Sequence, residues 1–313
     1  MNKHTNTTWL PGFGALGLAW GSSFLFIKWG LQTLTPIGVA FWRGALGGAT
    51  LLIVCAVTRQ RLPRRWSEWG HLAMMALLMN AVPGLLFAYG ETHVTSIMAG
   101  LLNATTPMMT VLVIGVAFKE QRINVNQVMG IVVGFVGIAL VTGAFTGLAR
   151  SSLVGVEALL AATLCYGVAF PYAKRYVATM PYSSTTLAAT QVCCSAILLS
   201  PLALLTKTTH AQLTTRALWG MIALGAVGTG VAYIWNFRNV KLAGSAVAST
   251  VTYMTPVVAT VLGVWLLHEP FKLTQLVGGA LVLLSAALVQ QRWRPLRVRS
   301  AARHNASGEV EVG

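Results

Sequence analysis

Residues 96–120 read SIMAGLLNATTPMMTVLVIGVAFKE, an apolar run that is long enough to cross a bilayer. A second copy of this run, SAVASTVTYMTPVVATVLGVWLLHE, occupies residues 245–269. An internal repeat of membrane helices with central helix breakers is typical of transporters. The two copies share a central Thr-Pro pair and a terminal Glu, which match at a constant separation of 149 residues as Pro107 with Pro256 and Glu120 with Glu269.

The composition indicates that the rest of the chain also lies in a membrane. Hydrophobic residues make up 55% of the chain and charged residues only 9%, whereas soluble proteins carry about 25% charged residues. The 22 Lys and Arg outnumber the 7 Asp and Glu, but they lie between apolar segments and form no basic face. We therefore expect the lipid bilayer, and no nucleic acid, as a partner.

Ten apolar segments follow one another with short connections, each near the length of about 20 residues that spans a bilayer. They cover residues 9–30, 36–58, 70–91, 96–118, 125–144, 154–176, 183–206, 217–237, 245–267 and 273–291. The expected organisation is a cytoplasmic N-terminal tail (1–8), a first five-helix repeat (9–144), an external linker (145–153), a second five-helix repeat (154–291) and a basic cytoplasmic tail (292–313).

The distribution of Lys and Arg orients these helices. If the N-terminus is cytoplasmic, sixteen Lys and Arg fall in the cytoplasmic segments and four in the outer loops. Cytoplasmic loops carry the excess of basic residues in membrane proteins. Both termini are therefore expected in the cytoplasm, and the protein in the cytoplasmic (inner) membrane. The four outer residues are Arg150, Lys207, Arg216 and Lys272.

The repeat extends to the first helix of each half. The motif that runs from Trp20 to Lys28 is matched from Tyr166 to Lys174, at a separation of 146 residues. Because each half has five helices, an odd number, the second half enters the membrane from the opposite side. The predicted fold is an all-α integral membrane protein of ten transmembrane helices in two inverted five-helix repeats, which supply the two related states of alternating access.

These paired motifs resemble the EamA family of the drug/metabolite transporter superfamily over about residues 12–291. The shared features are an aromatic-Gly…Lys first helix, a fourth helix with a central Thr-Pro pair and a terminal Glu, and a Gly-rich fifth helix. The resemblance implies a ten-helix bundle with a central cavity that usually works in the export of small metabolites. It does not name a substrate, since the superfamily carries amino acids, metabolites, sugars and drugs.

Arg43 is the most informative single candidate for substrate binding. It lies seven residues after Pro36 in the second helix, about 10 Å deep at 1.5 Å per residue. Ionisable residues inside a membrane normally face the bundle interior or a cavity, where a guanidinium would attract a carboxylate of the substrate. The alternatives are snorkelling to the outer headgroups and a structural contact with helix-end carbonyls.

Other polar and aromatic residues of the helices are candidate lining of the same cavity. Together they suit a small amphipathic molecule, although each one alone is also explained as a contact between helices. Pro107 and Pro256 are expected to kink their helices, either to shape the cavity or for packing alone. The remaining candidates are Trp20, Ser23, Asn80, Asn103, Thr106, Tyr166, Gln191, Tyr233, Asn236, Thr252 and Tyr253.

The acidic residues are expected at helix ends and not at the midplane of the membrane. Glu91 and Glu157 are interpreted as solvated helix ends; the alternative is that they form, with His93, a proton or substrate site at the outer side. The lack of a midplane carboxylate argues against a drug-cation exporter and leaves uniport or exchange open. Glu120 and Glu269 end their helices, where a negative charge opposes the helix dipole, so each needs a local partner. The candidates are Lys119 and Arg122 for the first, and Lys272 and His268 for the second.

The function that these features predict is secondary transport of small metabolites, such as amino acids or related compounds, by alternating access and in the direction of export. A drug or neutral-metabolite efflux permease, a membrane-embedded lipid-modifying enzyme and a non-transporting scaffold are the alternatives. The sequence holds no phosphate-binding loop, no His-Glu-x-x-His pair and no nucleophile elbow. We therefore expect no enzyme, cofactor or metal, and a monomer or homodimer.

Overall fold

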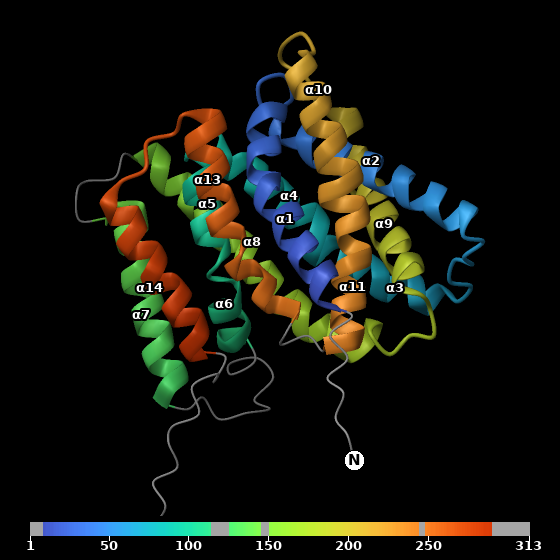
Figure 1. Cartoon of the computed structure of the whole chain (residues 1–313). Helices are drawn as coiled ribbons and strands as arrows, with labels where there is room; N and C mark the ends of the chain where they lie inside the picture. The colour runs from blue at the N-terminus through green and yellow to red at the C-terminus, as the bar shows by residue number, and fades with distance from the viewer. Residues whose placement is uncertain (1–8, 114–124, 145–149, 244–247, 290–313) are drawn as a thin grey trace, which may run out of the picture.

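The computed structural model describes residues 9–113, 125–144, 150–243 and 248–289. These residues form a bundle of helices (Figure 1). Within them, nine helical spans are long and apolar enough to cross a membrane, and the shorter apolar helix Leu273–Val289 is the tenth. The prediction of an all-helical membrane protein is therefore confirmed.

The first half of the chain supplies five spans. The first two are α1 (Leu10–Gly30) and α2 (Pro36–Val57). The third joins α3 (Trp66–Ala76), the π-helical η2 (Leu77–Ala81) and α4 (Val82–Glu91). The fourth is α5 (Ser96–Asn103) followed by α6 (Thr106–Val113), and the fifth is α7 (Val125–Thr142).

The second half repeats this order. Its spans are α8 (Arg150–Tyr172) with η5 (Ala173–Val177), then α9 (Ser184–Leu205). The third joins α10 (Thr215–Ile222), the π-helical η6 (Ala223–Val231) and α11 (Ala232–Ala243). The last two are the 3-10 turn η7 (Ser249–Tyr253) with α13 (Thr255–Leu267), and α14 (Leu273–Val289).

Equivalent helices begin with the same local chemistry. The N-cap hydroxyl of Thr35 accepts a hydrogen bond from Gly38 N in α2, and the N-cap hydroxyl of Ser183 does the same for Thr186 N in α9. Each cap satisfies one of the backbone N–H groups that the first turn of a helix leaves without a partner. The starts of these two helices are therefore encoded locally.

The fourth span of each half is interrupted near its middle. Residues 104–105 separate α5 from α6, and Pro107 is the second residue of α6. In the other half, η7 gives way to α13, whose second residue is Pro256. Proline has no backbone N–H and is tolerated in the first turn of a helix. Both expected kinks are thus breaks between two helical pieces.

The two halves run in opposite directions through the bundle. The Lys28 ammonium group near the end of α1 donates hydrogen bonds to the carbonyls of Glu91 (2.5 Å) and Val94 (2.7 Å) at the end of α4. Beside them, Gly155 near the start of α8 lies against the carbonyl of Gly90. The end of α1 and the start of α8 therefore share one end of the bundle, at the top of Figure 1, which we call the Lys28 end.

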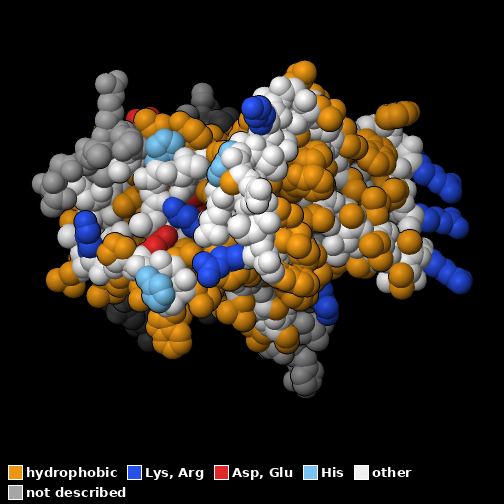
Figure 2. Space-filling view, turned by 90° about the horizontal axis from the view of Figure 1, so that it is seen from above, with side chains coloured by type: hydrophobic (Ala, Val, Ile, Leu, Met, Phe, Trp, Pro, Cys, Tyr) orange, Lys and Arg blue, Asp and Glu red, His pale blue; other side chains and the backbone are white. Residues whose placement is uncertain are grey.

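The last helices of the two halves pack together through glycine. A Cβ atom added to Gly278 of α14 would lie 2.7 Å from the carbonyl oxygen of Gly137 in α7, and one added to Gly137 would lie 2.8 Å from that of Gly278. Small residues let membrane helices approach closely, so this pair depends on both glycines. Large apolar side chains such as Leu204 and Trp265 are exposed on the outside of the bundle, as lipid-facing residues are. Seen from above, apolar side chains also cover much of the Lys28 end of the bundle (Figure 2).

Candidate substrate cavity

A cavity lies among α1, α2, the third span, α5, α8, α11 and η7. Seven of its lining residues were candidates from the sequence, namely Trp20, Ser23, Arg43, Asn103, Tyr166, Tyr233 and Thr252. The other five are the apolar residues Phe24, Ile27, Met79, Phe87 and Phe170. The mixture of aromatic, apolar and a few polar side chains in the lining is that of a site for a small molecule.

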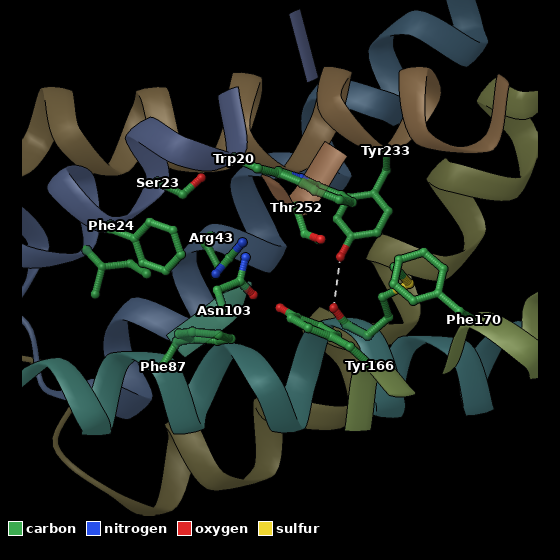
Figure 3. Close-up of a pocket in the computed structure, with 12 residues that line it drawn as sticks. Trp20, Ser23, Phe24, Arg43, Phe87, Asn103, Tyr166, Phe170, Tyr233 and Thr252 are labelled. Carbon is green, nitrogen blue, oxygen red and sulfur yellow. Dashed lines mark hydrogen bonds between the residues drawn. The ribbon is translucent and has the colours of Figure 1, made fainter. Parts of the chain in front are cut away.

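The guanidinium of Arg43 points into this cavity beside Asn103 (Figure 3). Its Nε donates a hydrogen bond of 3.3 Å to Oγ1 of Thr229, whose own hydroxyl donates to the carbonyl of Leu224. That is the one hydrogen bond of the guanidinium among the described residues. Arginine carries five N–H donors, so most of them remain available to a bound anion.

Aromatic rings form two walls on opposite sides of the Arg43 side chain (Figure 3). On one side, Phe87 stacks on Tyr166 with ring centroids 5.9 Å apart and meets Phe24 edge-on at 5.7 Å. On the other, Trp20 meets Tyr233 at 5.8 Å. Aromatic pairs at these separations are favourable beyond the area they bury, so the walls are rigid apolar surfaces around one cationic group.

The lining of the cavity contains residues at equivalent positions of the two sequence repeats. Three pairs of lining residues occupy equivalent positions in the two halves, Trp20 with Tyr166, Phe24 with Phe170 and Asn103 with Thr252. The two phenylalanines belong to the motif that identified the repeat, so their separation of 146 residues was a usable signal. Ile27, Met79 and Phe87 carried no such signal, because nothing distinguishes them from the other apolar residues of their helices.

Two of the remaining candidates join helices and do not line the cavity. Gln191 of α9 donates a buried hydrogen bond of 2.5 Å from Nε2 to Oδ1 of Asn80 in η2. Its counterpart is the bond from Arg43 to Thr229, since Gln191 follows Arg43 by 148 residues and Thr229 follows Asn80 by 149. Each bond connects the second span of one half with the π-helical segment of the other.

The other three candidates also lie outside the lining. The Thr106 hydroxyl donates a hydrogen bond of 2.8 Å to the carbonyl of Asn103, and this bond joins the first residue of α6 to the last residue of α5. Asn236 is buried in α11, and its Oδ1 has no hydrogen-bond partner among the described residues. Tyr253 lies half-buried in η7. In the lining itself, the Tyr233 hydroxyl donates a hydrogen bond of 2.8 Å to the carbonyl of Met79 (Figure 3).

Glu269 has partners that differ from those expected. Its carboxylate accepts hydrogen bonds from the backbone N–H of Ser96 (2.9 Å) and Ile97 (3.1 Å) and from the Ser96 hydroxyl (2.9 Å). The expectation of a basic partner in Lys272 or His268 is therefore wrong. A carboxylate at a helix N-terminus is favourable, and Glu269 supplies one to α5. Glu120 lies outside the described residues.

Comparison with known proteins gives one family for the whole bundle. The model of the EamA-like transporter family matches residues 9–143 and 153–290. An uncharacterized transporter of Archaeoglobus fulgidus is 23% identical over 280 residues, which cover 87% of this chain and 95% of the relative. A probable terminal-alkyne amino-acid exporter of Streptantibioticus cattleyicolor is 28% identical over 276 residues, 88% of this chain and 91% of the relative.

A solved crystal structure has the same fold. It matches 92% of this chain and 99% of its own length with a TM-score of 0.65 and 20% sequence identity. At that identity the likeness concerns the arrangement of the helices and says nothing of the substrate. The arrangement itself includes the helices that line the cavity.

Proposed function

Because the chain belongs to the EamA-like transporter family, we propose that it exports amino acids or closely related metabolites across the cytoplasmic membrane. The family consists of transporters and not of enzymes, so the chain is a multi-pass membrane transporter for a small molecule. The substrate class, the direction and the orientation are the parts that we propose. Both termini are cytoplasmic, and residues 9–144 and 154–291 form the two repeats.

One observation carries the substrate class, namely the guanidinium of Arg43 between aromatic walls. A carboxylate pairs with a guanidinium through two parallel hydrogen bonds, and an apolar side chain packs against Phe24, Phe87 or Trp20. An amino acid with an apolar side chain has both parts. The named activity of the Streptantibioticus cattleyicolor relative, a probable amino-acid exporter, supports the same class.

The inverted halves support alternating access. The end of α1 and the start of α8 lie at the same end of the bundle, so each structural unit of one half has an oppositely directed counterpart. If the two halves exchange their conformations, the cavity opens to the opposite side of the membrane. The breaks at Pro107 and Pro256 divide the fourth span of each half into two helical pieces, at equivalent places in the two halves.

Ligand-induced thermal stabilisation of the purified protein tests the proposal. A ligand that binds the native state raises its melting temperature by mass action. We expect leucine or phenylalanine to stabilise the wild type, Arg43→Ala to abolish the stabilisation, and Arg43→Lys to keep the charge but weaken binding about tenfold, since one charge-assisted hydrogen bond contributes about 1.5 kcal/mol or more.

Arg64→Ala is the matched control, because Arg64 is an exposed arginine outside the cavity. It should bind like the wild type. Equal affinity of Arg43→Ala and the wild type for these amino acids would refute the role of Arg43. If only neutral or cationic compounds stabilise all variants, the substrate is a drug or a neutral metabolite and the amino-acid proposal fails.

A further inference from the structure

The Lys28 end of the bundle holds a buried carboxylate that the sequence did not reveal. Glu91, the last residue of α4, is 1% exposed, and neither of its carboxylate oxygens accepts a hydrogen bond from any described residue. Its expected place at a solvated helix end is therefore wrong. Buried carboxylates normally have donors around them, and a membrane protein that keeps one without donors has a functional site there by default.

The nearest cation does not neutralise Glu91 through contact. The Lys28 ammonium is directed to the backbone carbonyls of Glu91, which ends α4, and of Val94, three residues further along the chain. Arg43 from α2 faces the cavity and donates to Thr229. An ionised carboxylate without donors is strongly disfavoured in a low-dielectric interior. Burying a protonated, neutral carboxylic acid costs much less free energy.

The other titratable groups around this end are already engaged or solvated. Glu269, which follows α13, is bound to the first turn of α5. His93, next to α4 in the chain, contacts the Thr92 hydroxyl and the Tyr89 carbonyl. Glu157 of α8 is exposed. Among the described residues, Glu91 is therefore the one acidic group at this end that is neither exposed nor hydrogen-bonded through its carboxylate.

Glu91 also breaks the symmetry of the repeat. The separation of 149 residues that relates Asn80 to Thr229 places Val240 at the position equivalent to Glu91. Likewise, the lysines of the first helices differ, since Lys28 is half-buried and its counterpart Lys174 is exposed. A purely structural acid would be expected in both halves, whereas a group that acts at one side of the membrane is needed once.

The position of Glu91 connects it with the cavity. Phe87 lies four residues earlier on α4, and Ile27 precedes Lys28 on α1; both line the cavity. Four residues of helix correspond to about 6 Å along its axis. A charged group of a molecule bound to Arg43 therefore lies within range of a strong electrostatic interaction with the Glu91 carboxyl.

We propose that Glu91 is a proton-binding site through which this transporter exchanges one proton for one substrate molecule. When the Lys28 end is open, the carboxylate takes up H⁺ from the external water and becomes a neutral carboxylic acid. The neutral group is then buried as the end closes. When the cavity faces the cytoplasm, the substrate ammonium group enters, the O–H bond of Glu91 breaks, and H⁺ leaves to the cytoplasm. The carboxylate then pairs with that ammonium group.

This mechanism adds a driving ion to the proposed export function. It depends on that proposal only for the identity of the substrate. A direct test of the proton site needs no substrate. Infrared difference spectroscopy during a pH titration should show the carbonyl stretch of a protonated carboxylic acid at neutral pH in the wild type and in the control Glu157→Gln, and should not show it in Glu91→Gln. An absent band in the wild type, or an unchanged band in Glu91→Gln, would overturn the assignment.

Transport by proteoliposomes tests the coupling. With leucine as the probe, a pH gradient should drive accumulation by the wild type and by Glu157→Gln. Glu91→Gln should lose this accumulation, because an amide neither takes up nor releases a proton, and whatever leucine–leucine exchange it retains should no longer depend on pH. Glu91→Asp, which keeps a carboxylic acid, should retain part of the proton-driven uptake and serves if Glu91→Gln does not fold.

The outcomes separate the two proposals. If the wild type exchanges leucine but ignores the pH gradient, proton coupling fails and amino-acid export stands. If the wild type binds and moves no amino acid but shows the Glu91 band, export of amino acids fails and the proton site stands. Full proton-driven uptake by Glu91→Gln would refute the coupling role outright.

Discussion

The carboxylate of Glu269 stabilises a helix from the other half of the chain, 173 residues away from it in sequence. The residue can reach α5 because His268 adopts a left-handed conformation, with φ of 53°, and turns the chain back at the end of α13. Gly263 leaves the space, since a Cβ atom there would lie 3.1 Å from both the Glu269 carboxylate and the Ser96 hydroxyl. One side chain thus ties α13 to the start of α5.

Glu269→Gln should lower the free energy of unfolding by about 1–2 kcal/mol, because a charge-assisted cap of two backbone N–H groups is replaced by a neutral one. Thermal denaturation in detergent measures the loss. Glu157→Gln removes an exposed carboxylate of α8 and should leave the melting temperature unchanged. Equal melting temperatures for Glu269→Gln and the wild type would mean that this cap contributes nothing to stability.

At the scale of the elements, the pair of α7 and α14 depends on close backbone contact. The Cβ atom of an alanine at position 278 would lie 2.7 Å from the Gly137 carbonyl oxygen and equally close to the backbone nitrogen of Val141. Backbone atoms cannot rotate away as a flexible side chain can, so the two helices must separate. Gly278 is therefore the position of α14 at which the smallest possible change has a large effect.

Gly278→Ala should destabilise the protein by about 1–3 kcal/mol, the usual range for overpacking. Gly70→Ala in α3 is the control, because nothing lies within 4 Å of an added Cβ there, and alanine favours a helix over glycine by up to about 1 kcal/mol. The two variants should shift the melting temperature in opposite directions. A stable Gly278→Ala protein would show that the helices are not packed as closely as described.

The sequence predicted the elements better than the contacts between them. Apolar length is a local signal, and it placed the ten spans close to their observed bounds wherever the structure describes those bounds. The interruption of the fourth span was visible in Pro107. The π-helical segments η2, η5 and η6 were not predicted, because they follow from tertiary packing. The partners of Glu269 and the burial of Glu91 were missed for the same reason, since each depends on helices that are distant in sequence.

At the scale of the whole molecule, the orientation in the membrane is still a prediction. It rests on the sixteen Lys and Arg of the expected cytoplasmic segments against four in the outer loops. Reporters fused to the chain should be active in the cytoplasm at both termini. Fusions after Gln32, between α1 and α2, should behave as external ones, because one span separates them from the N-terminus.

Alkaline phosphatase, which is active outside the cytoplasm, and a fluorescent protein that folds inside it make the measurement at each site. A periplasmic C-terminus would invert the whole assignment. In that case the Lys28 end, with Glu91, would face the cytoplasm, and the proton would move out as the substrate moves in.

The hydrogen bonds from Gln191 to Asn80 and from Arg43 to Thr229 have a consequence for how the gene can be divided. Each joins an element of one half to an element of the other, so neither half holds its own partners. A gene cut at the codons for residues 145–149 should yield two fragments that are degraded when produced singly and that restore transport when produced together. The two fragments would then behave like two separate five-helix proteins that lie in one membrane in opposite orientations. A fusion of two such genes would give the inverted repeat of this chain.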